Sequence, residues 1–209
     1  MLPQSSTDQI VDPIWNVVGI DPSLRNWGLA KGTLNLRTME LVLGKVAVVN
    51  PVLPTGKQVR QNSLDLESAK QLSIHTHQAV ANAQAVFVEV PVGSQSARAM
   101  ASYGICVGVL GSLRAAGIPF FEVTPNEVKL VSVGKKTATK QEMIDWAMRK
   151  HPEANWPTFT QKGETKVSEA KAEHMADATA AIHAGIQTNE FKQLASFYKE
   201  THANHHQAT

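Results

Sequence analysis

The chain has 209 residues, 43% of them hydrophobic, with 20 basic and 18 acidic side chains and a formal net charge of +2. This length and composition suit one hydrophobic core with appendages, and the charge permits a nucleic-acid partner without demanding one. The single cysteine, Cys106, excludes an internal disulfide bond and a thiolate zinc site. Because neither a signal peptide nor a membrane-spanning apolar run is visible, we expect a cytoplasmic or organelle-matrix protein with no membrane partner.

The hydrophobic patterns predict an α/β chain that opens with strands and continues with alternating helices and strands. The expected strands are Val17–Asp21, Trp27–Leu36, Met39–Val49, Ala85–Val90 and Ile118–Val123. The expected helices are Asp65–Ala83, Ser94–Ala116, a short helix opened by Thr124-Pro125, Thr139–Lys150, Ser168–Ile186 and Phe191–Tyr198, with an irregular segment at Pro152–Val167. This order favours a mixed five-stranded sheet, three antiparallel strands and then two parallel ones, with helices on both faces.

The same patterns divide the chain into three parts. Residues 1–13 are polar and punctuated by proline, which predicts a flexible N-terminal arm. Residues 14–189 form the expected folded domain, and residues 190–209 form a C-terminal helix with a polar tail.

Two apolar strands end in an acidic residue. Asp21 follows the apolar run Val17–Ile20, and Glu89 lies in the otherwise apolar sequence Val88-Glu89-Val90-Pro91. An unpaired buried carboxylate is costly, so each of these side chains is expected to meet a metal, a cation or solvent at the sheet edge. Taken singly, Asp21 could instead cap the chain or pair with Arg25, and Glu89 could form a buried salt bridge.

The last long predicted helix carries a third polar cluster, Glu173-His174-Met175-Ala176-Asp177, in an Ala-rich segment. His174 and Asp177 are three residues apart and therefore share a helix face, as do Glu173 and Asp177 at four residues apart. His174 taken alone could be a satisfied core histidine. Together, three carboxylates and a histidine on separate elements suit magnesium, and two such ions can clamp a phosphodiester displacement.

Five stretches occur in the order seen in RuvC-type Holliday-junction resolvases of the RNase H-like superfamily, which the chain resembles. They are Gly19-Ile20-Asp21-Pro22-Ser23, Val88-Glu89-Val90-Pro91, Phe121 to Lys129, Val133 to Lys140 and Ala172 to Ala178. The resemblance runs from residue 17 to about residue 187. No single stretch is specific, but five in order are a strong signal.

This resemblance implies an RNase H-like fold and a crossover junction endodeoxyribonuclease that uses two Mg²⁺ ions per active site, with Mn²⁺ as a substitute. Asp21 would bridge the ions, and Glu89 and Asp177 would each hold one. The family's fourth position is an acid or a histidine, and His174 fits it better than Glu173, because it keeps the three-residue step to Asp177. His174 would ligate an ion or handle a proton. The products would carry a 5′-phosphate and a 3′-hydroxyl.

Four lysines form the expected nucleic-acid contact. Lys140 and Lys129 match lysines that lie near the scissile phosphate in the family, where an ammonium group stabilises developing charge. Lys135 and Lys136, just before Lys140, extend this basic patch. The alternative is that these lysines are ordinary solvated side chains.

A ridge of small residues along Ser94–Ala116 indicates close backbone packing, either on the protein's own sheet or on a second copy. Its members are Ala97, Ala101, Gly104, Gly108, Gly111 and Ala115. The resemblance favours a homodimer, since a two-fold junction cut on two strands needs two active sites.

The chain departs from the family at the wedge, because Val92 stands where members often carry an aromatic residue. Trp156, Phe159 and Lys162, in a segment that lengthens the chain, could contact DNA or form a loop that covers the core.

The expected partner is branched DNA, in particular a four-way junction. Two other functions remain open: an RNase H-like nuclease for flaps, other branched DNA or RNA–DNA hybrids, and an inactive protein that only binds junctions. An actin-like ATPase is excluded, because the chain is too short for a second lobe and lacks glycine-rich phosphate loops.

Overall fold

The computed structural model describes residues 13–56 and 60–205, so the arm predicted for residues 1–13 lies almost wholly outside the described residues. The central feature is a five-stranded sheet with the order β3-β2-β1-β4-β5. Its strands are β1 (Ile14–Asp21), β2 (Trp27–Asn35), β3 (Leu41–Val49), β4 (Ala85–Glu89) and β5 (Phe121–Val123). The β1–β2 and β2–β3 pairs are antiparallel, whereas β1–β4 and β4–β5 are parallel, which confirms the predicted mixed sheet.

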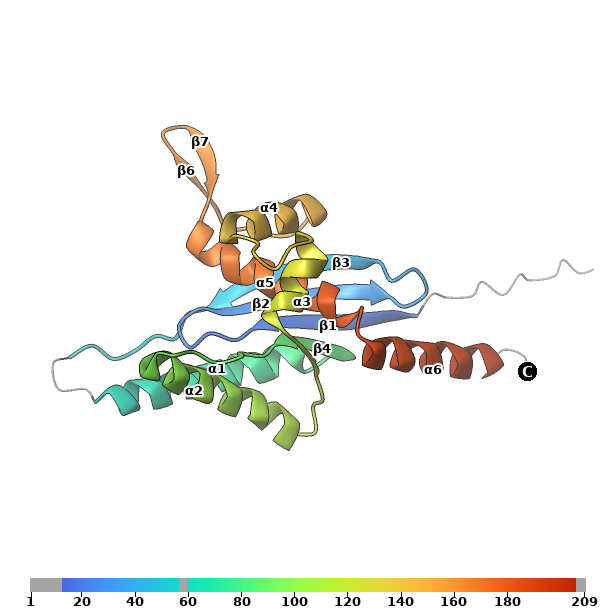
Figure 1. The fold of residues 1–209 in the computed structure, drawn as a ribbon, viewed down its shortest axis with the longest axis horizontal. Coiled ribbons are helices and arrows are strands. Elements are labelled where there is room, and N and C mark those ends of the chain that lie inside the picture. The colour runs from blue at the N-terminus through green and yellow to red at the C-terminus, as the bar shows by residue number, and fades with distance from the viewer. Residues whose placement is uncertain (1–12, 57–59, 206–209) are drawn as a thin grey trace, which may run out of the picture.

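Helices cover both faces of this sheet, as the sequence predicts (Figure 1). One face carries α1 (Gln61–Val80) and α2 (Ala97–Ala115). The other carries α3 (Pro125–Ser132), α4 (Lys140–Lys150) and α5 (Glu169–Gly185), and α6 (Asn189–His205) extends from the end of α5. In the described part of the chain, no helix is long and apolar enough to cross a membrane.

The sheet separates two hydrophobic cores, and the alternation of β1 assigns its side chains to them. Trp15 and Val17 are buried in the core shared with α5, whereas Val18 and Ile20 are buried in the core shared with α1 and α2. Asp21 continues the series Trp15, Val17 and Gly19, so its side chain lies on the α5 face of the sheet.

The segment Pro152–Val167, predicted to be irregular, contains a two-stranded hairpin instead. Its strands are β6 (Thr158–Gln161) and β7 (Glu164–Val167), paired antiparallel. The turn residues Lys162 and Gly163 both have positive φ, at 53° and 83°, as a tight two-residue hairpin turn requires. The prediction was wrong because no residue of β6 is buried, so the strand shows no apolar alternation.

Several other predicted elements have different bounds, among them α1, which runs over Gln61–Val80 and not Asp65–Ala83, and β1, which begins at Ile14 and not at Val17. The strand expected at Ile118–Val123 begins only at Phe121, because the backbone N–H of Ile118 bonds to the carbonyl of Leu113 and belongs to the turn after α2. The terminal helix runs from Asn189 to His205 and not only over Phe191–Tyr198. Its Phe191 is fully buried and packs edge-on against Phe87, so α6 is attached to the main core.

Candidate active site

Asp21 and Glu89 lie at the same edge of the sheet. Ile20 of β1 is beside Val88 of β4 in the parallel pair, and each acid is the next residue of its strand. Residues two or four positions apart in a strand point to the same face. Glu89 therefore shares a face with Phe87, and Asp21 shares a face with Val17; both Phe87 and Val17 are buried in the core on the α5 side. Both carboxylates therefore point to the face that α5 covers.

Two glycines allow α5 to approach this edge closely. A Cβ atom added at Gly19 would lie 2.0 Å from the carbonyl oxygen of Ala178, and one added at Gly28 would lie 2.1 Å from that of His174. Any side chain at these positions would therefore push α5 away from β1 and β2. The close approach is what brings His174 and Asp177 to the acidic edge of the sheet.

His174 contacts Asp21 directly. The distance between His174 Nδ1 and Asp21 Oδ2 is 2.6 Å, and the two side chains are 17% and 15% exposed. Burial alone would lower the pKa of His174, but its hydrogen bond to Asp21 and the charges of Asp21, Glu173 and Asp177 raise that pKa overall. His174 is thus poised to donate from Nδ1 to the Asp21 carboxylate.

The three acids lie in a poorly solvated space, and the charge of Asp21 acts on the other two. Burial, followed by the charges of Asp21 and Asp177, raises the pKa of Glu89 to about 9. Burial, followed by the charges of Asp21 and Glu173, raises the pKa of Asp177 to about 7. Burial also raises the pKa of Asp21, although the hydrogen bond from His174 opposes this effect. A site that raises carboxylate pKa values in this way is typical of functional clusters.

The predicted lysines occupy different positions around the acids. Lys140 forms an ion pair with Glu173, with 2.7 Å between Nζ and Oε1. The positive charge of Lys129 opposes the upward pKa shifts of Glu89 and Asp177, so this lysine lies within electrostatic range of both acids. Lys135 forms an ion pair with Glu142, and Lys136 is exposed. The structure therefore directs Lys129 and Lys140 to the site, whereas the charge of Lys135 is balanced nearby.

The pairing of Glu173 with Lys140 separates the two residues that compete for the fourth position. His174 contacts Asp21, while Glu173 points to a lysine whose side chain is 76% exposed. Glu173 still contributes negative charge that acts on Asp21 and Asp177. His174 is accordingly the one of the two that contacts Asp21.

The donor set fits divalent metal ions in its chemistry. Within residues 13–56 and 60–205, no three His, Cys, Asp or Glu side chains are gathered closely enough, as they lie, to hold a metal ion. The acids nevertheless raise one another's pKa values, and a divalent cation among them would relieve that repulsion. Carboxylate oxygens suit hard ions such as Mg²⁺ and Mn²⁺.

Two residues near the site were not assigned a role from the sequence. Gly28 follows Trp27 at the start of β2, and only the three-dimensional contact with His174 reveals its importance. Cys106 of α2 is buried and lies close enough for Asp21 to affect it. Burial, with the charge of Asp21 added, raises the pKa of this thiol to about 12, so Cys106 stays protonated and is not a nucleophile.

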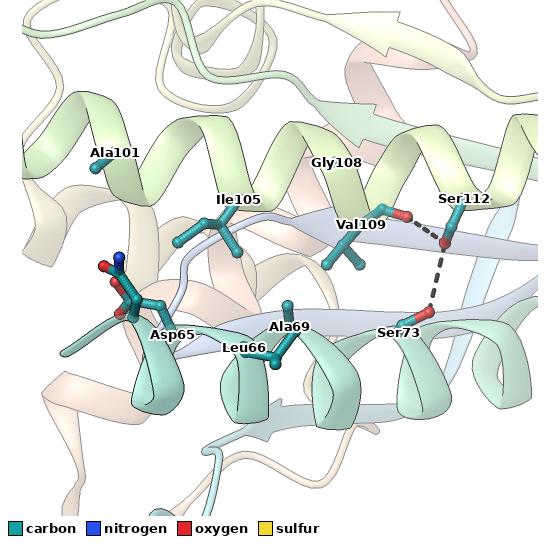
Figure 2. A pocket seen from close by; sticks show the side chains of 10 residues that line it. Asp65, Leu66, Ala69, Ser73, Ala101, Ile105, Gly108, Val109 and Ser112 are labelled. Carbon is teal, nitrogen blue, oxygen red and sulfur yellow. Dashed lines mark hydrogen bonds between the residues drawn. The ribbon is translucent and has the colours of Figure 1, made fainter. Parts of the chain in front are cut away.

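The opposite face of the molecule holds a groove of about 600 Å³ between α1 and α2 (Figure 2). Figure 2 shows Leu66 and Ala69 of α1 facing Ile105 and Val109 of α2 across it. The small residues of α2 are exposed, and a Cβ atom added at Gly104, Gly108 or Gly111 would meet nothing within 4 Å. The ridge therefore does not pack on the protein's own sheet. Of the two alternatives that the sequence left open for this ridge, packing on the sheet is wrong.

The sheet order and the helices on both faces define the RNase H-like fold class. Within that class the chain has a RuvC-like fold. It superposes on Thermus thermophilus RuvC with a TM-score of 0.55 and 22% identity, over 81% of this chain and 92% of that chain. For T. thermophilus RuvC in complex with a Holliday junction substrate, the TM-score is 0.57 and the identity 21%, with the same coverage. No protein-family model and no curated protein matches the chain.

Proposed function

We propose that the chain is a metal-dependent endonuclease that cuts branched DNA and resolves four-way junctions. The observation that carries this proposal is that Asp21, Glu89 and Asp177 lie near one sheet edge, where burial raises the pKa of each and the charge of Asp21 adds to the shifts of Glu89 and Asp177. Such a cluster gains nothing for stability without a cation. The RuvC-like fold supports the substrate class, because one of the similar structures is a complex with a Holliday junction.

Asp21, Glu89 and Asp177 are the residues that would hold two Mg²⁺ or Mn²⁺ ions, with His174 as the fourth position. Bound ions would supply Lewis acidity at the phosphate and lower the pKa of a water molecule. The hydrogen bond from His174 Nδ1 orients the Asp21 carboxylate and leaves Nε2 as the atom that can bind an ion or exchange a proton.

The lysines would act on the phosphate. The Lys140 ammonium group pairs with Glu173, but the Lys140 side chain is 76% exposed, so a phosphate can reach it. Lys129 already acts electrostatically on Glu89 and Asp177. Positive charge at these two positions stabilises the charge that develops on phosphoryl oxygens, and Lys135 and Lys136 extend the basic surface along the DNA. Hydrolysis would leave 5′-phosphate and 3′-hydroxyl ends.

The active form would be a homodimer that uses the outer surface of α2. The exposed ridge of glycines and alanines permits another backbone to approach closely, and the neighbouring groove offers apolar surface. A two-fold dimer would present two active sites, as the symmetric cutting of two strands requires.

The decisive experiment compares wild type with Asp21→Asn on a panel of end-labelled substrates in Mg²⁺. The panel contains a four-way junction, a flap, a linear duplex and an RNA–DNA hybrid. We expect wild type to cut the junction in preference, and the variant to bind it with similar affinity but not to cut it. If the protein cuts the hybrid or the flap faster than the junction, the chain is an RNase H-like nuclease with a different substrate. Junction binding without any metal-dependent cutting would identify a binding protein.

A further inference from the structure

The β6–β7 hairpin is the part of the fold that the proposed active site does not explain. It projects beyond α4 and α5, at the end of the molecule where β1 ends and α5 begins (Figure 1). Its base is fixed, because the Ser168 N–H donates to the carbonyl of Pro157 over 2.7 Å and the buried Trp156 indole donates to that of His151 over 2.8 Å. The hairpin therefore leaves the domain in a defined direction, and its free end reaches into solvent.

One face of the hairpin carries an aromatic ring beside a cation. Phe159 and Lys166 are directly opposite in the antiparallel pair, so their side chains lie on the same face. Phe159 is 46% exposed, and among the described residues no aromatic ring packs against it. The Lys166 ammonium group donates a hydrogen bond to Gln161 Oε1 over 3.1 Å and is 3.9 Å from Glu164, and both contacts are solvent-exposed. Neither side chain contributes to a core.

This face lines a hollow formed with α4 and the start of α5, the two helices that carry Lys140 and His174. Phe159 and Lys166 line a hollow of about 590 Å³ together with Gln141 of α4 and the residues Ser168, Glu169 and Ala170. Gln141 follows Lys140, and Ala170 precedes His174 by about one helical turn, or about 6 Å along the axis.

We infer that this hairpin face receives an unstacked base of the branched DNA, with the base against the Phe159 ring and its phosphate near Lys166. A fully paired duplex keeps its base faces covered, so an exposed phenyl ring has no partner there. At a branch point a base can leave the stack, and aromatic rings bind such bases with little sequence preference. The inference rests on the proposed function as a nuclease for branched DNA.

Photo-crosslinking tests the contact without requiring cleavage. The photoreactive amino acid p-benzoylphenylalanine replaces Phe159 in the full chain, and in a matched control it replaces Phe197, which is 66% exposed on α6. Each protein is irradiated with a four-way junction or a linear duplex in Ca²⁺. We expect the Phe159 position, and not the Phe197 position, to crosslink to junction nucleotides next to the branch point.

Binding affinities provide the second measurement. Phe159→Ala should weaken binding to the junction by roughly 5-fold or more and leave duplex binding nearly unchanged, since one stacked base is lost. Phe159→Tyr, which keeps the ring, should bind like wild type, as should Phe197→Ala. Circular dichroism confirms that each variant is folded.

The outcomes separate this inference from the proposed function. If wild type cuts the junction while Phe159→Ala binds it normally and no crosslink forms, the hairpin inference is wrong and the nuclease proposal stands. If the crosslink and the affinity loss occur but no substrate is cut, the DNA contact stands and the nuclease proposal falls. If wild type binds no branched DNA at all, both are wrong.

Discussion

His174 Nδ1 lies 2.6 Å from Asp21 Oδ2, although the two residues are 153 positions apart in the sequence. The hydrogen bond joins the last long helix of the domain to its first strand, at the edge of the sheet that also carries Glu89. It also compensates part of the burial cost of the Asp21 charge. Asp21 therefore already has a hydrogen-bond partner, His174, that favours its ionised form before any metal binds.

His174→Ala should lower the rate of junction cleavage by roughly 10- to 100-fold, the usual cost of removing a group that orients a metal-binding residue. Glu173→Gln should cost much less, because Glu173 contacts the exposed Lys140 and not Asp21. Single-turnover cleavage in saturating Mg²⁺ provides the comparison. A larger loss for Glu173→Gln than for His174→Ala would assign the fourth position to Glu173.

Glu89→Gln should stabilise the metal-free protein while it abolishes cleavage. The folded-state pKa of Glu89 is raised to about 9 from an ordinary 4.5, so the folded state retains a proton that the unfolded state loses. The stability cost is absent below pH 4.5 and grows as pH rises toward 9. Glutamine avoids it, with an expected gain of roughly 1–2 kcal/mol near pH 7.5 after discounting for partial exposure.

Thermal unfolding in EDTA and in Mn²⁺ checks the Glu89 prediction. Mn²⁺ should raise the Tm of wild type, because a bound cation relieves the repulsion among the acids, and should raise that of Glu89→Gln much less. Glu169→Gln, at an exposed position of α5, is the matched control and should respond to Mn²⁺ as wild type does. An equal response in all three proteins would count against a metal site at Glu89.

Gly28→Ala should destabilise the protein by about 1–3 kcal/mol and reduce cleavage, because the new Cβ atom would overlap the carbonyl oxygen of His174 at 2.1 Å. Gly44→Ala, in the adjacent strand β3, is the control, since its nearest contact would be 3.7 Å away. Urea denaturation measures both. Equal stabilities for the two variants would show that α5 can move away at no cost.

Gly108→Arg tests the dimer proposed for the outer surface of α2. The monomer can accommodate the side chain, because an added Cβ atom meets nothing within 4 Å. In a dimer packed on this ridge the arginine would separate the two α2 helices. Light scattering should therefore show a monomer, and the cleavage assay should show that this monomer cuts junctions poorly. Val42→Arg, at an exposed position of β3, should leave the mass unchanged. A wild type that is already monomeric would contradict the proposal.

Local patterns explain why much of the fold could be predicted. Asp21 and Glu89 stand out because each ends an apolar strand, and His174 and Asp177 stand out because three-residue spacing puts them on one face of an Ala-rich helix. The order of strands and crossovers then fixes the mixed sheet. Each of these signals lies within about ten residues of sequence.

Long-range contacts and solvent-exposed elements gave no such signal. Nothing local indicates that Gly28 contacts the backbone of His174, or that Lys140 pairs with Glu173. The β6–β7 hairpin was missed because β6 has no buried residue and hence no apolar alternation. The strand β5 was predicted too long, because Ile118 is apolar but belongs to a turn.

A buried pair of histidines, away from the acidic edge, predicts a second pH effect. His183 Nε2 lies 2.8 Å from His151 Nε2, and the Trp146 ring packs edge-on against His183. Burial, and then the charges of His151 and Lys150, lowers the pKa of His183 to about 3. Above pH 6.5 His183 is neutral in both the folded and unfolded states, so it contributes nothing to the pH dependence of the free energy of unfolding.

Below pH 6.5 the unfolded chain takes up a proton at this position that the folded protein refuses, so stability falls as pH drops toward 3. The slope for one proton is at most about 1.4 kcal/mol per pH unit. His183→Gln should therefore lose less stability than wild type between pH 6.5 and 4.5 in urea denaturation. His75→Gln, at an exposed position of α1, should follow wild type. Parallel curves for His183→Gln and wild type would mean that His183 accepts its proton without unfolding.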